Sequence, residues 1–367
     1  MSIVLIVLAA TSLAALAFVT YLLADGVRNT LARRRIEQAR RPLELVVTRR
    51  DDATDELFRV QLARPNGKRL PHFVAGQHVV LSAPAGPGGK TVRRAYSLAA
   101  WQRRPRSYEL GIKREPEGVM SSWAWQALGV GARITSSPPK GDFVLDTNAR
   151  HVVLIGGGIG ITPMRAMLQQ ALAHGRTSTI VLVHAARHRA DLIYHSEFAS
   201  LARQHAELRY FPMLSRPDPL WQGESGRLDA TRLLAAIPHP QDATFYLCAG
   251  MALMNALSEG LTRAGIAPAR IHWEAFGVAS AAASSGTSIR VDDGFECATA
   301  GEPSLLATLE ANGFTLASEC RAGSCGECRM KLIDGEVDWL IPATCELTAQ
   351  DILPCICQAR GDLRLAR

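Results

Sequence analysis

The feature that most constrains this chain is a loop in which three cysteines lie within nine residues. They follow the spacing Cys320-x4-Cys325-x2-Cys328, and the residues between them are mostly small. A disulfide framework is disfavoured, because the chain is 367 residues long and its other five cysteines follow no regular spacing. A zinc site is disfavoured as well, because zinc usually takes its ligands as pairs of short knuckles, whereas these thiols form one continuous loop. Three such thiols therefore indicate a different metal–sulfur site, completed by a distant thiol.

This spacing is typical of a [2Fe–2S] cluster, in which one loop wraps the cluster and a fourth thiolate closes it from elsewhere in the chain. The small residues Ala322, Gly323, Ser324 and Gly326 let the backbone approach and direct N–H groups at the sulfur atoms.

Residues 288–367 resemble a plant-type ferredoxin domain, which implies a β-grasp fold. The segments SIRV, GFECATA, EPSLLATLEANG, the cysteine loop, KLIDGEVDW and DILPCICQARGDL follow the order of that family. The family places its last ligand seven residues before a final Asp, and Asp362 stands at that distance from Cys355. The resemblance therefore implies that Cys357 is not a ligand. The implied metal ligands are Cys320, Cys325, Cys328 and Cys355.

The chain begins with an almost uninterrupted apolar run over residues 3–23, which as a helix would be roughly 30 Å long. A cleaved signal peptide is disfavoured because no basic residue precedes the run, and a buried core helix because the run has no apolar stripe. Residues 1–25 are therefore predicted to be a transmembrane anchor, followed by a basic juxtamembrane segment, 26–42. The positive-inside rule then predicts a single-pass protein of the inner (cytoplasmic) membrane with cytoplasmic catalytic domains.

The formal net charge of +7 is unevenly distributed along the chain. Residues 26–50 hold eight Arg against two Glu, and residues 51–150 hold 15 Lys and Arg against 9 Asp and Glu. Residues 288–367 hold 7 against 13. The basic run favours anionic lipid headgroups over nucleic acid as a partner. The acidic part is suited to docking on the basic part or on a basic partner protein, unless both are merely solvated faces.

Residues 43–148 alternate apolar and polar residues between Pro, Gly and Asp breaks, which predicts a small antiparallel β-barrel. The sequence Arg94-x-Tyr96-Ser97 resembles the flavin signature of the ferredoxin reductase family. The resemblance implies that Arg94 pairs with a flavin phosphate and that Tyr96 lies against the isoalloxazine ring. It also implies that the Ser97 hydroxyl bonds near flavin N5, where hydride arrives.

A second flavin motif follows about twenty residues later. Gly118-Val119-Met120-Ser121 resembles the family's second phosphate-binding turn, where helix N-terminal amides and a hydroxyl hold the pyrophosphate. An ordinary capped helix would use the same serine. Further on, SPPKGDFVL resembles the strand that closes the barrel of FAD-binding members. Because the FMN-binding branch tends to have Asn where Gly141 stands, the resemblance favours FAD over FMN.

Residues 149–277 alternate apolar strands with helical patterns, which predicts a doubly wound parallel sheet. The first strand runs into a glycine-rich loop, and the helix after it is predicted to have Thr162 as N-cap and Pro163 as first residue. The loop is not a strict G-x-G-x-x-G fingerprint. It resembles the nicotinamide-nucleotide loop of ferredoxin reductases. The glycines concerned are Gly156, Gly157, Gly158 and Gly160.

Later positions in the same region fit the resemblance. Cys248-Ala249-Gly250 resembles the family's Cys-Gly-Pro turn beside the nicotinamide, with two of its three residues changed, and a buried core thiol is the alternative for Cys248. Glu274 and Phe276 match the family's Glu-x-Phe strand end near the reacting rings, where Glu274 either influences hydride transfer or is structural. The catalytic residues implied are Tyr96, Ser97, Cys248 and Glu274.

The nucleotide donor is NADH or NADPH. Arg187 follows the second strand of this region, where a 2′-phosphate would sit, although Asp191 stands close by. Residues 278–287 are small and without periodicity, and they predict a flexible linker to the ferredoxin domain.

The whole pattern implies a multidomain oxidoreductase in which NAD(P)H reduces FAD, and FAD passes single electrons to a [2Fe–2S] cluster. The predicted anchor favours an integral-membrane di-iron desaturase or hydroxylase as electron acceptor. A Rieske-type oxygenase and a quinone-directed reductase are alternatives. A membrane-tethered iron–sulfur redox sensor is the non-enzymatic alternative.

Overall fold

The structure is a computed structural model that describes residues 41–115, 118–275 and 285–367. The chain divides into two units, Met1–Leu43 and Glu44–Arg367, and the fold and sites below belong to the second. The predicted anchor, residues 1–25, and most of the basic segment 26–42 lie outside the described residues.

The predicted location in the inner membrane is contradicted by the helices of the structure. Within the described ranges no helix is long and apolar enough to cross a membrane. The longest α-helix there has 14 residues and is therefore about 21 Å long. A bilayer's hydrocarbon core is about 30 Å thick. The prediction of a single-pass protein with cytoplasmic catalytic domains is corrected accordingly.

The first domain is the predicted antiparallel barrel, formed by a six-stranded sheet in the order β4-β3-β6-β1-β2-β5. Its elements are β1 (Leu43–Asp52), β2 (Leu57–Ala63), β3 (His78–Ala83), β4 (Val92–Ser97), β5 (Ser107–Lys113), α2 (Val119–Ala127) and β6 (Arg133–Ser136). The two outer strands meet through a bridge between Leu98 and Leu110, which brings the sheet towards closure. Alternate residues of β2, namely Phe58, Val60 and Leu62, are fully buried in its interior, as the period of two requires.

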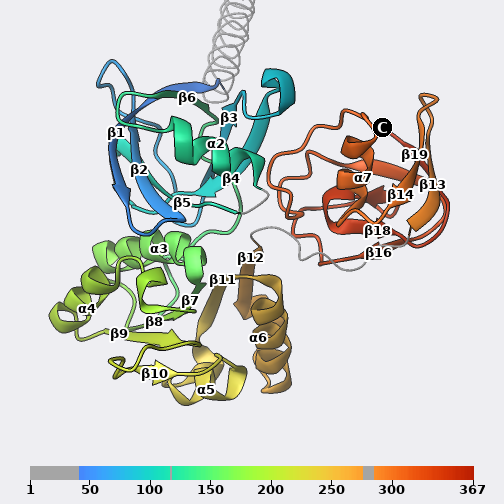
Figure 1. Cartoon of the computed structure of the whole chain (residues 1–367). Coiled ribbons are helices and arrows are strands. Elements are labelled where there is room, and N and C mark those ends of the chain that lie inside the picture. The colour runs from blue at the N-terminus through green and yellow to red at the C-terminus, as the bar shows by residue number, and fades with distance from the viewer. Residues whose placement is uncertain (1–40, 116–117, 276–284) are drawn as a thin grey trace, which may run out of the picture. The chain divides into compact units, whose positions relative to one another are not determined.

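The second domain is a parallel sheet in the order β10-β9-β8-β7-β11-β12, covered by helices on both faces (Figure 1). Its elements are β7 (His151–Gly157), α3 (Ile161–His174), β8 (Thr179–Ala186), α4 (His195–Gln204), β9 (Leu208–Leu214), β10 (Glu224–Ser225), α5 (Ala230–Ala235), β11 (Thr244–Ala249), α6 (Met251–Arg263) and β12 (Ile271–Ala275). One apolar core lies under α3 and α4, and another under α5 and α6. The strand order reverses at β7, so ligands are expected beyond the carboxyl ends of β7 and β11. The predicted doubly wound fold is therefore confirmed.

The third domain holds a mixed five-stranded sheet in the order β14-β13-β19-β15-β17 and a two-stranded sheet of β16 and β18. Its elements are β13 (Ser285–Val291), β14 (Glu296–Ala300), α7 (Leu305–Ala311), β15 (Met330–Asp334), β16 (Val337–Trp339), β17 (Asp351–Ile352), β18 (Cys357–Ala359) and β19 (Leu363–Ala366). The two terminal strands β13 and β19 pair in parallel, and Leu305 and Leu309 of α7 pack into the same core as strand residues. This arrangement agrees with the predicted β-grasp domain. β13 begins inside the predicted linker 278–287, and most of that linker lies outside the described residues.

A partly buried ionic network holds the barrel against α3 and α4. Arg165 donates to Glu197 at 2.8 and 2.9 Å and to the carbonyl of Ala99 at 2.9 Å. It also reaches Glu109 at 3.3 Å, and the Tyr194 hydroxyl donates to the same carboxylate at 2.9 Å. Because every charge is paired, the network is compatible with its low exposure. It fixes the two domains that share the pocket described next.

Candidate functional site

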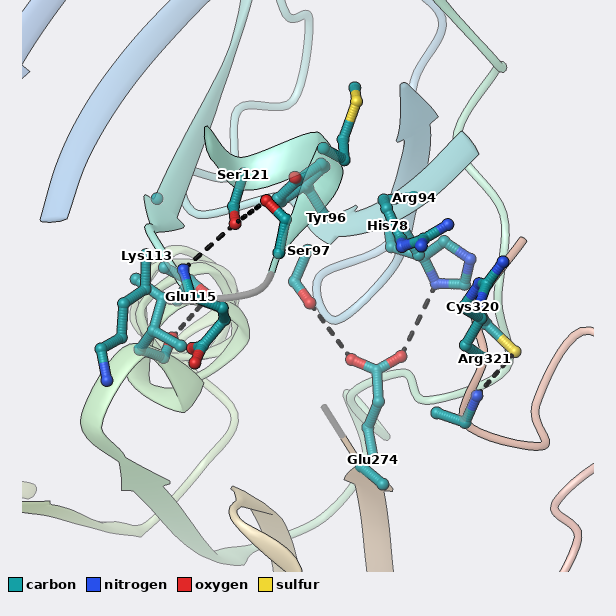
Figure 2. A pocket seen from close by; sticks show the side chains of 18 of the residues that line it. His78, Arg94, Tyr96, Ser97, Lys113, Glu115, Ser121, Glu274, Cys320 and Arg321 are labelled. Carbon is teal, nitrogen blue, oxygen red and sulfur yellow. Dashed lines mark hydrogen bonds and ion pairs between the residues drawn. The ribbon is translucent and has the colours of Figure 1, made fainter. Parts of the chain in front are cut away.

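A cavity of about 300 Å³ lies where the barrel meets the nucleotide-binding domain (Figure 2). This volume is at the lower end of the range for small-molecule sites. Ten of the residues predicted from sequence line it: Arg94, Tyr96, Ser97, Gly118, Val119, Met120, Ser121, Thr162, Glu274 and Cys320. The motifs are far apart in the chain, so their convergence is a property of the fold.

Three buried polar side chains meet on one wall of the cavity. The Ser97 hydroxyl donates to Oε2 of Glu274 at 3.2 Å, and Nδ1 of His78 lies 3.6 Å from Oε1 of the same carboxylate (Figure 2). All three are at most 9% exposed. Neither ring nitrogen of His78 has a hydrogen-bond partner among the described residues. Since buried polar groups are nearly always hydrogen-bonded, this wall is built to meet polar atoms of a ligand.

Two neighbouring side chains of β4 provide charge and an aromatic ring. Burial, together with the nearby Arg321, lowers the pKa of Arg94 to about 10. The guanidinium therefore stays charged at neutral pH, in a place where a phosphate would relieve the repulsion between two cations. Burial raises the pKa of Tyr96 to about 12, so its ring is neutral at any physiological pH.

The second predicted phosphate turn forms the start of α2. Gly118 is the N-cap residue of this helix, and no side chain caps it. The Ser121 hydroxyl accepts from the N–H of Glu115 at 3.1 Å and donates to the carbonyl of Gly118 at 3.1 Å. A Cβ at Gly118 would stand 2.2 Å from the Ser121 hydroxyl, so glycine is required there. The helix N-terminus and Val119, which is exposed, face the cavity.

The glycine loop after β7 packs directly on the end of β11. A Cβ at Gly160 would stand 2.0 Å from the Cys248 carbonyl oxygen, and one at Gly157 would stand 2.6 Å from the Ala249 Cβ. These two glycines are therefore required by close packing. Gly158, with φ of 56°, has open space at its Cβ position, as a loop that receives a ligand requires.

The predicted start of the following helix is wrong by two residues. α3 begins at Ile161 with Gly160 as N-cap, because a 3-10 turn over Gly158–Gly160 leads straight into the helix. Thr162 is thus the second helical residue and Pro163 the third. The Thr162 hydroxyl donates to the carbonyl of Ile159 at 2.9 Å.

Cys248 and Glu274 are register partners on the neighbouring strands β11 and β12. The Cys248 thiol is fully buried, and burial together with Glu274 raises its pKa well above the ordinary value. Cys248 does not line the cavity. Gly250 is the N-cap residue of α6. Phe276 lies outside the described residues.

Arg187 is exposed immediately beyond the carboxyl end of β8. Its carbonyl accepts from the N–H of Arg216 at 2.9 Å, which brings a second arginine alongside. Neither guanidinium has a partner among the described residues. Asp191 is held by accepting from the N–H of His188 at 3.1 Å. Beyond the carboxyl end of β8, two guanidinium groups are therefore available to a ligand, whereas the carboxylate of Asp191 already accepts a hydrogen bond.

The four predicted metal ligands come together as two pairs. The Cys325 thiol donates to the Cys320 sulfur, and this bond together with nearby donors lowers the pKa of Cys320 well below its ordinary value. The pKa of Cys328 is likewise lowered, chiefly by a hydrogen bond from Cys355. Among the described residues no three Cys, His, Asp or Glu side chains are grouped as ligands of one metal ion would be. Two thiol pairs instead fit a dinuclear cluster, in which each metal takes two thiolates.

The backbone of the loop supports the same interpretation. The N–H groups of Ala322, Ser324 and Cys325 all point at the Cys320 sulfur, each at 3.4 Å. Gly323 and Gly326 have φ of 73° and 72°, conformations that favour glycine. Donors aimed at sulfur stabilise thiolate and so fit a bound cluster.

The remaining cysteines of the tail lie in different cores. Cys355 packs with Cys328 and Ala322, whereas Cys357 packs with Ile289 and other residues of the sheet core. Burial raises the pKa of Cys357 to about 12. This separation favours Cys355 over Cys357 as the fourth ligand.

Sequence analysis missed several lining residues, of which His78, Lys113, Glu115 and Arg321 carry polar or charged groups. A histidine within the apolar run GQHVVL was a possible signal for His78, since a buried polar residue on a strand needs a partner. The others carry no local signal.

Three family descriptions match the chain in order. Residues 44–145 match the oxidoreductase FAD-binding domain, residues 154–259 the oxidoreductase NAD-binding domain, and residues 289–360 the 2Fe-2S iron-sulfur cluster binding domain.

Curated relatives match most of these domains. The heme-dependent oxidative N-demethylase beta subunit of Ectopseudomonas mendocina (strain ymp) is 33% identical over 80% of this chain and 88% of its own length. The phthalate 4,5-dioxygenase oxygenase reductase subunit of Pseudomonas putida is 27% identical over 87% and 94%. A flavohemoprotein of Burkholderia sp. (strain TH2) is 33% identical over 64% of this chain, which spans only 59% of that relative.

A solved structure of a phthalate dioxygenase reductase covers 89% of this chain and 98% of its own, with a TM-score of 0.66 and 24% identity. At this identity the likeness concerns the fold.

Proposed function

The chain belongs to the ferredoxin reductase-like family of flavin and [2Fe–2S] reductases, and on this premise we propose that it carries electrons from NADH or NADPH to an oxygenase component. It is an oxidoreductase with FAD-binding, NAD-binding and [2Fe–2S]-binding domains. The observation that carries the proposal is the lining of one cavity by the Arg94-x-Tyr96-Ser97 strand, by Glu274 and by the loop from Cys320 to Ser324. Nucleotide, flavin and cluster would thereby meet at one place.

The flavin would be held from both sides of the cavity. We assign its phosphates to the Arg94 guanidinium and to the start of α2, where Ser121 and the helix N-terminal N–H groups of Val119 and Met120 lie. Tyr96 would pack on the ring as a neutral phenol. FAD is preferred to FMN.

A flavin bound here would supply hydride acceptance and the release of single electrons. The side chains of the cavity wall would orient the reacting groups. Ser97 is held by Glu274, so its hydroxyl has a fixed direction in a site of low exposure. His78 stands behind the carboxylate, with its Nδ1 3.6 Å from Oε1 of Glu274, and limits the positions that the carboxylate can take.

The nicotinamide nucleotide would lie along the carboxyl edge of the parallel sheet. Its pyrophosphate is assigned to the loop of Gly156, Gly157, Gly158 and Gly160, with Thr162 and Pro163 in the first turn of α3. Cys248 and Gly250, at the end of β11, and Phe276 would lie near the nicotinamide. Arg187 is assigned to a 2′-phosphate, so we propose that NADPH is a donor.

The cluster would be bound by Cys320 with Cys325 and by Cys328 with Cys355, one pair for each iron. The proposed domain limits are 43–148, 149–277 and 288–367, with the linker 278–287 between the last two.

The acceptor was predicted to be a membrane desaturase or hydroxylase, an interpretation that depended on the anchor. The inner-membrane location is contradicted, so the membrane is not proposed as a partner. The relative named as a phthalate 4,5-dioxygenase reductase subunit favours the alternative, a Rieske-type oxygenase. The name of the N-demethylase relative includes a haem-dependent reaction, so a haem-dependent oxygenase is the second candidate for the electron acceptor.

An anaerobic visible spectrum of the purified protein tests the proposal. Flavin bands with a cluster shoulder should both bleach when NADPH or NADH is added. A cluster spectrum that neither donor bleaches would overturn it.

A further inference from the structure

The ferredoxin domain has an unusually exposed segment at residues 333–339, which we call the 333–339 segment. Six of its seven residues are exposed, and only Val337 is half-buried. Ile333 and Trp339 are 45% and 42% exposed, and Trp339 is the one aromatic among the large apolar side chains that the described residues expose. Single exposed apolar residues are ordinary. Two of them within seven residues call for an explanation.

The segment lies next to the proposed cluster ligands. β16 pairs only with β18 among the described strands, and Trp339 stands opposite Cys357, two residues from Cys355. The N–H of Leu340 donates to the carbonyl of Ile356 at 2.9 Å, which ties the segment to the ligand turn. Strands so paired are about 5 Å apart. Figure 1 shows β16 beside β18 in this domain.

The segment is also acidic. It contains Asp334, Glu336 and Asp338 and no Lys or Arg. Arg360 lies 3.4 Å from Glu336 and 3.9 Å from Asp338, whereas Asp334 has no ion pair in the part of the chain that the structure describes. One cation against three acids leaves a net charge of −2.

We propose that the 333–339 segment is the docking surface for the electron-accepting protein, a partner with an apolar centre and a basic rim. An exposed aromatic ring surrounded by charge is the usual form of a binding hot spot. The acids would attract a basic partner and orient it with its acceptor near the cluster, where electron transfer is fastest. The inference rests on the proposed function, because it presupposes that electrons leave through the cluster.

Charge argues against other occupants. A second copy that met this segment with its own 333–339 segment would bring the same acids together, and like charges across an interface are costly. An anionic lipid surface would be repelled for the same reason. The transfer itself moves one electron from the reduced cluster to an oxidised acceptor and requires no proton.

The test uses oxidised cytochrome c, a basic haem protein, as the probe. Its binding to the oxidised holoprotein is measured by isothermal titration calorimetry at low ionic strength, so no turnover is needed. Trp339→Ala should raise Kd about tenfold or more. Trp339→Phe should restore most of the affinity. Glu336→Gln combined with Asp338→Asn should weaken binding and flatten its dependence on salt.

Leu220→Ala is the matched control, because Leu220 is 80% exposed on the nucleotide-binding domain. Cluster content is checked by iron analysis and visible absorption for each variant. Wild-type Kd in Trp339→Ala with an intact cluster would overturn the proposal, and so would the absence of binding by the wild-type protein. A dimer that Trp339→Ala dissociates, seen by light scattering, would assign the surface to a second copy instead. Failure of NAD(P)H to bleach the cluster would count against the proposed function alone.

Discussion

Replacing Glu274 by Gln should slow hydride transfer without loosening the fold. The substitution keeps the shape of the side chain and an acceptor oxygen but removes the charge that faces both Ser97 and His78. The Ser97 hydroxyl would still find an acceptor at about the same place. It would be held more weakly.

The magnitude follows from that one bond. A hydrogen bond to a charged group contributes about 1.5–3 kcal/mol, and a neutral one about 0.5–1.5 kcal/mol. The change therefore costs about 1–1.5 kcal/mol. If all of it is expressed in the transition state, flavin reduction slows by about 5- to 12-fold. The KM for the nucleotide should change little, because neither residue is assigned to its phosphates.

The assay is anaerobic stopped-flow absorption of the flavin after mixing with NADPH or NADH. Glu259→Gln is the control, since Glu259 is exposed on α6 and its side chain has no partner among the described residues. Ser97→Ala, alone and combined with Glu274→Gln, completes a double-mutant cycle that should show coupling of about 1 kcal/mol. Strictly additive effects, or an unchanged rate in Glu274→Gln, would refute the assigned role of the pair.

Three further measurements bear on other parts of the structure, and a fourth on the donor. Arg165→Met should lower the free energy of unfolding by about 1–3 kcal/mol, measured with denaturant, because it leaves two partly buried carboxylates without their cation. Cys355→Ser should lose iron, whereas Cys357→Ser should keep it, by iron analysis; the reverse pattern would exchange their roles. Burial lowers the pKa of His184 to about 3, below the unfolded value of about 6.5, so the unfolded state takes up the proton first and stability should fall as the pH is lowered from about 6.5 to about 3. His184→Gln should flatten this fall in thermal melts. Arg187→Ala should reduce kcat/KM for NADPH at least about fivefold and leave that for NADH nearly unchanged, a loss of about 1 kcal/mol.

Controls separate these effects from general damage. Arg209 is exposed, and its replacement by Met should leave the free energy of unfolding within about 0.5 kcal/mol of wild type. An equally small effect of Arg165→Met would mean that the network contributes little. If Arg187→Ala lowered kcat/KM equally for NADPH and NADH, Arg187 would not be the residue that binds the 2′-phosphate.

The order of the domains could be predicted from the sequence, because each domain has its own pattern of apolar residues and its own motif. The barrel alternates with period two, the parallel sheet alternates strands and helices, and the cysteine spacing belongs to one kind of loop. The helix start after the glycine loop was misplaced for a local reason. The rule that places Pro at the first helical position pointed to Pro163, whereas the requirement that Gly160 pack on the Cys248 carbonyl starts the helix at Ile161.

His78 shows what such rules leave out. On the sequence it is one polar residue at the start of an apolar strand, and its spacing to Glu274 carries no signal. Only the packing of β3 against the end of β12 brings the two side chains to 3.6 Å. Arg321 and Lys113 entered the pocket lining in the same way, through tertiary structure.

The choice between Cys355 and Cys357 shows how packing decides what spacing leaves open. Two residues apart, both thiols are close enough in sequence to serve as the fourth ligand. In the fold, the turn at Pro354–Ile356 directs Cys355 towards Cys328, while Cys357 enters β18 and packs into the sheet core. A cluster ligand must be a thiolate close to its metal, whereas a thiol in an apolar core stays protonated and unreactive. The raised pKa of Cys357 agrees with the role of a core thiol. Because Trp339 pairs with that same strand, the ligand turn and the proposed docking surface are held at a fixed separation.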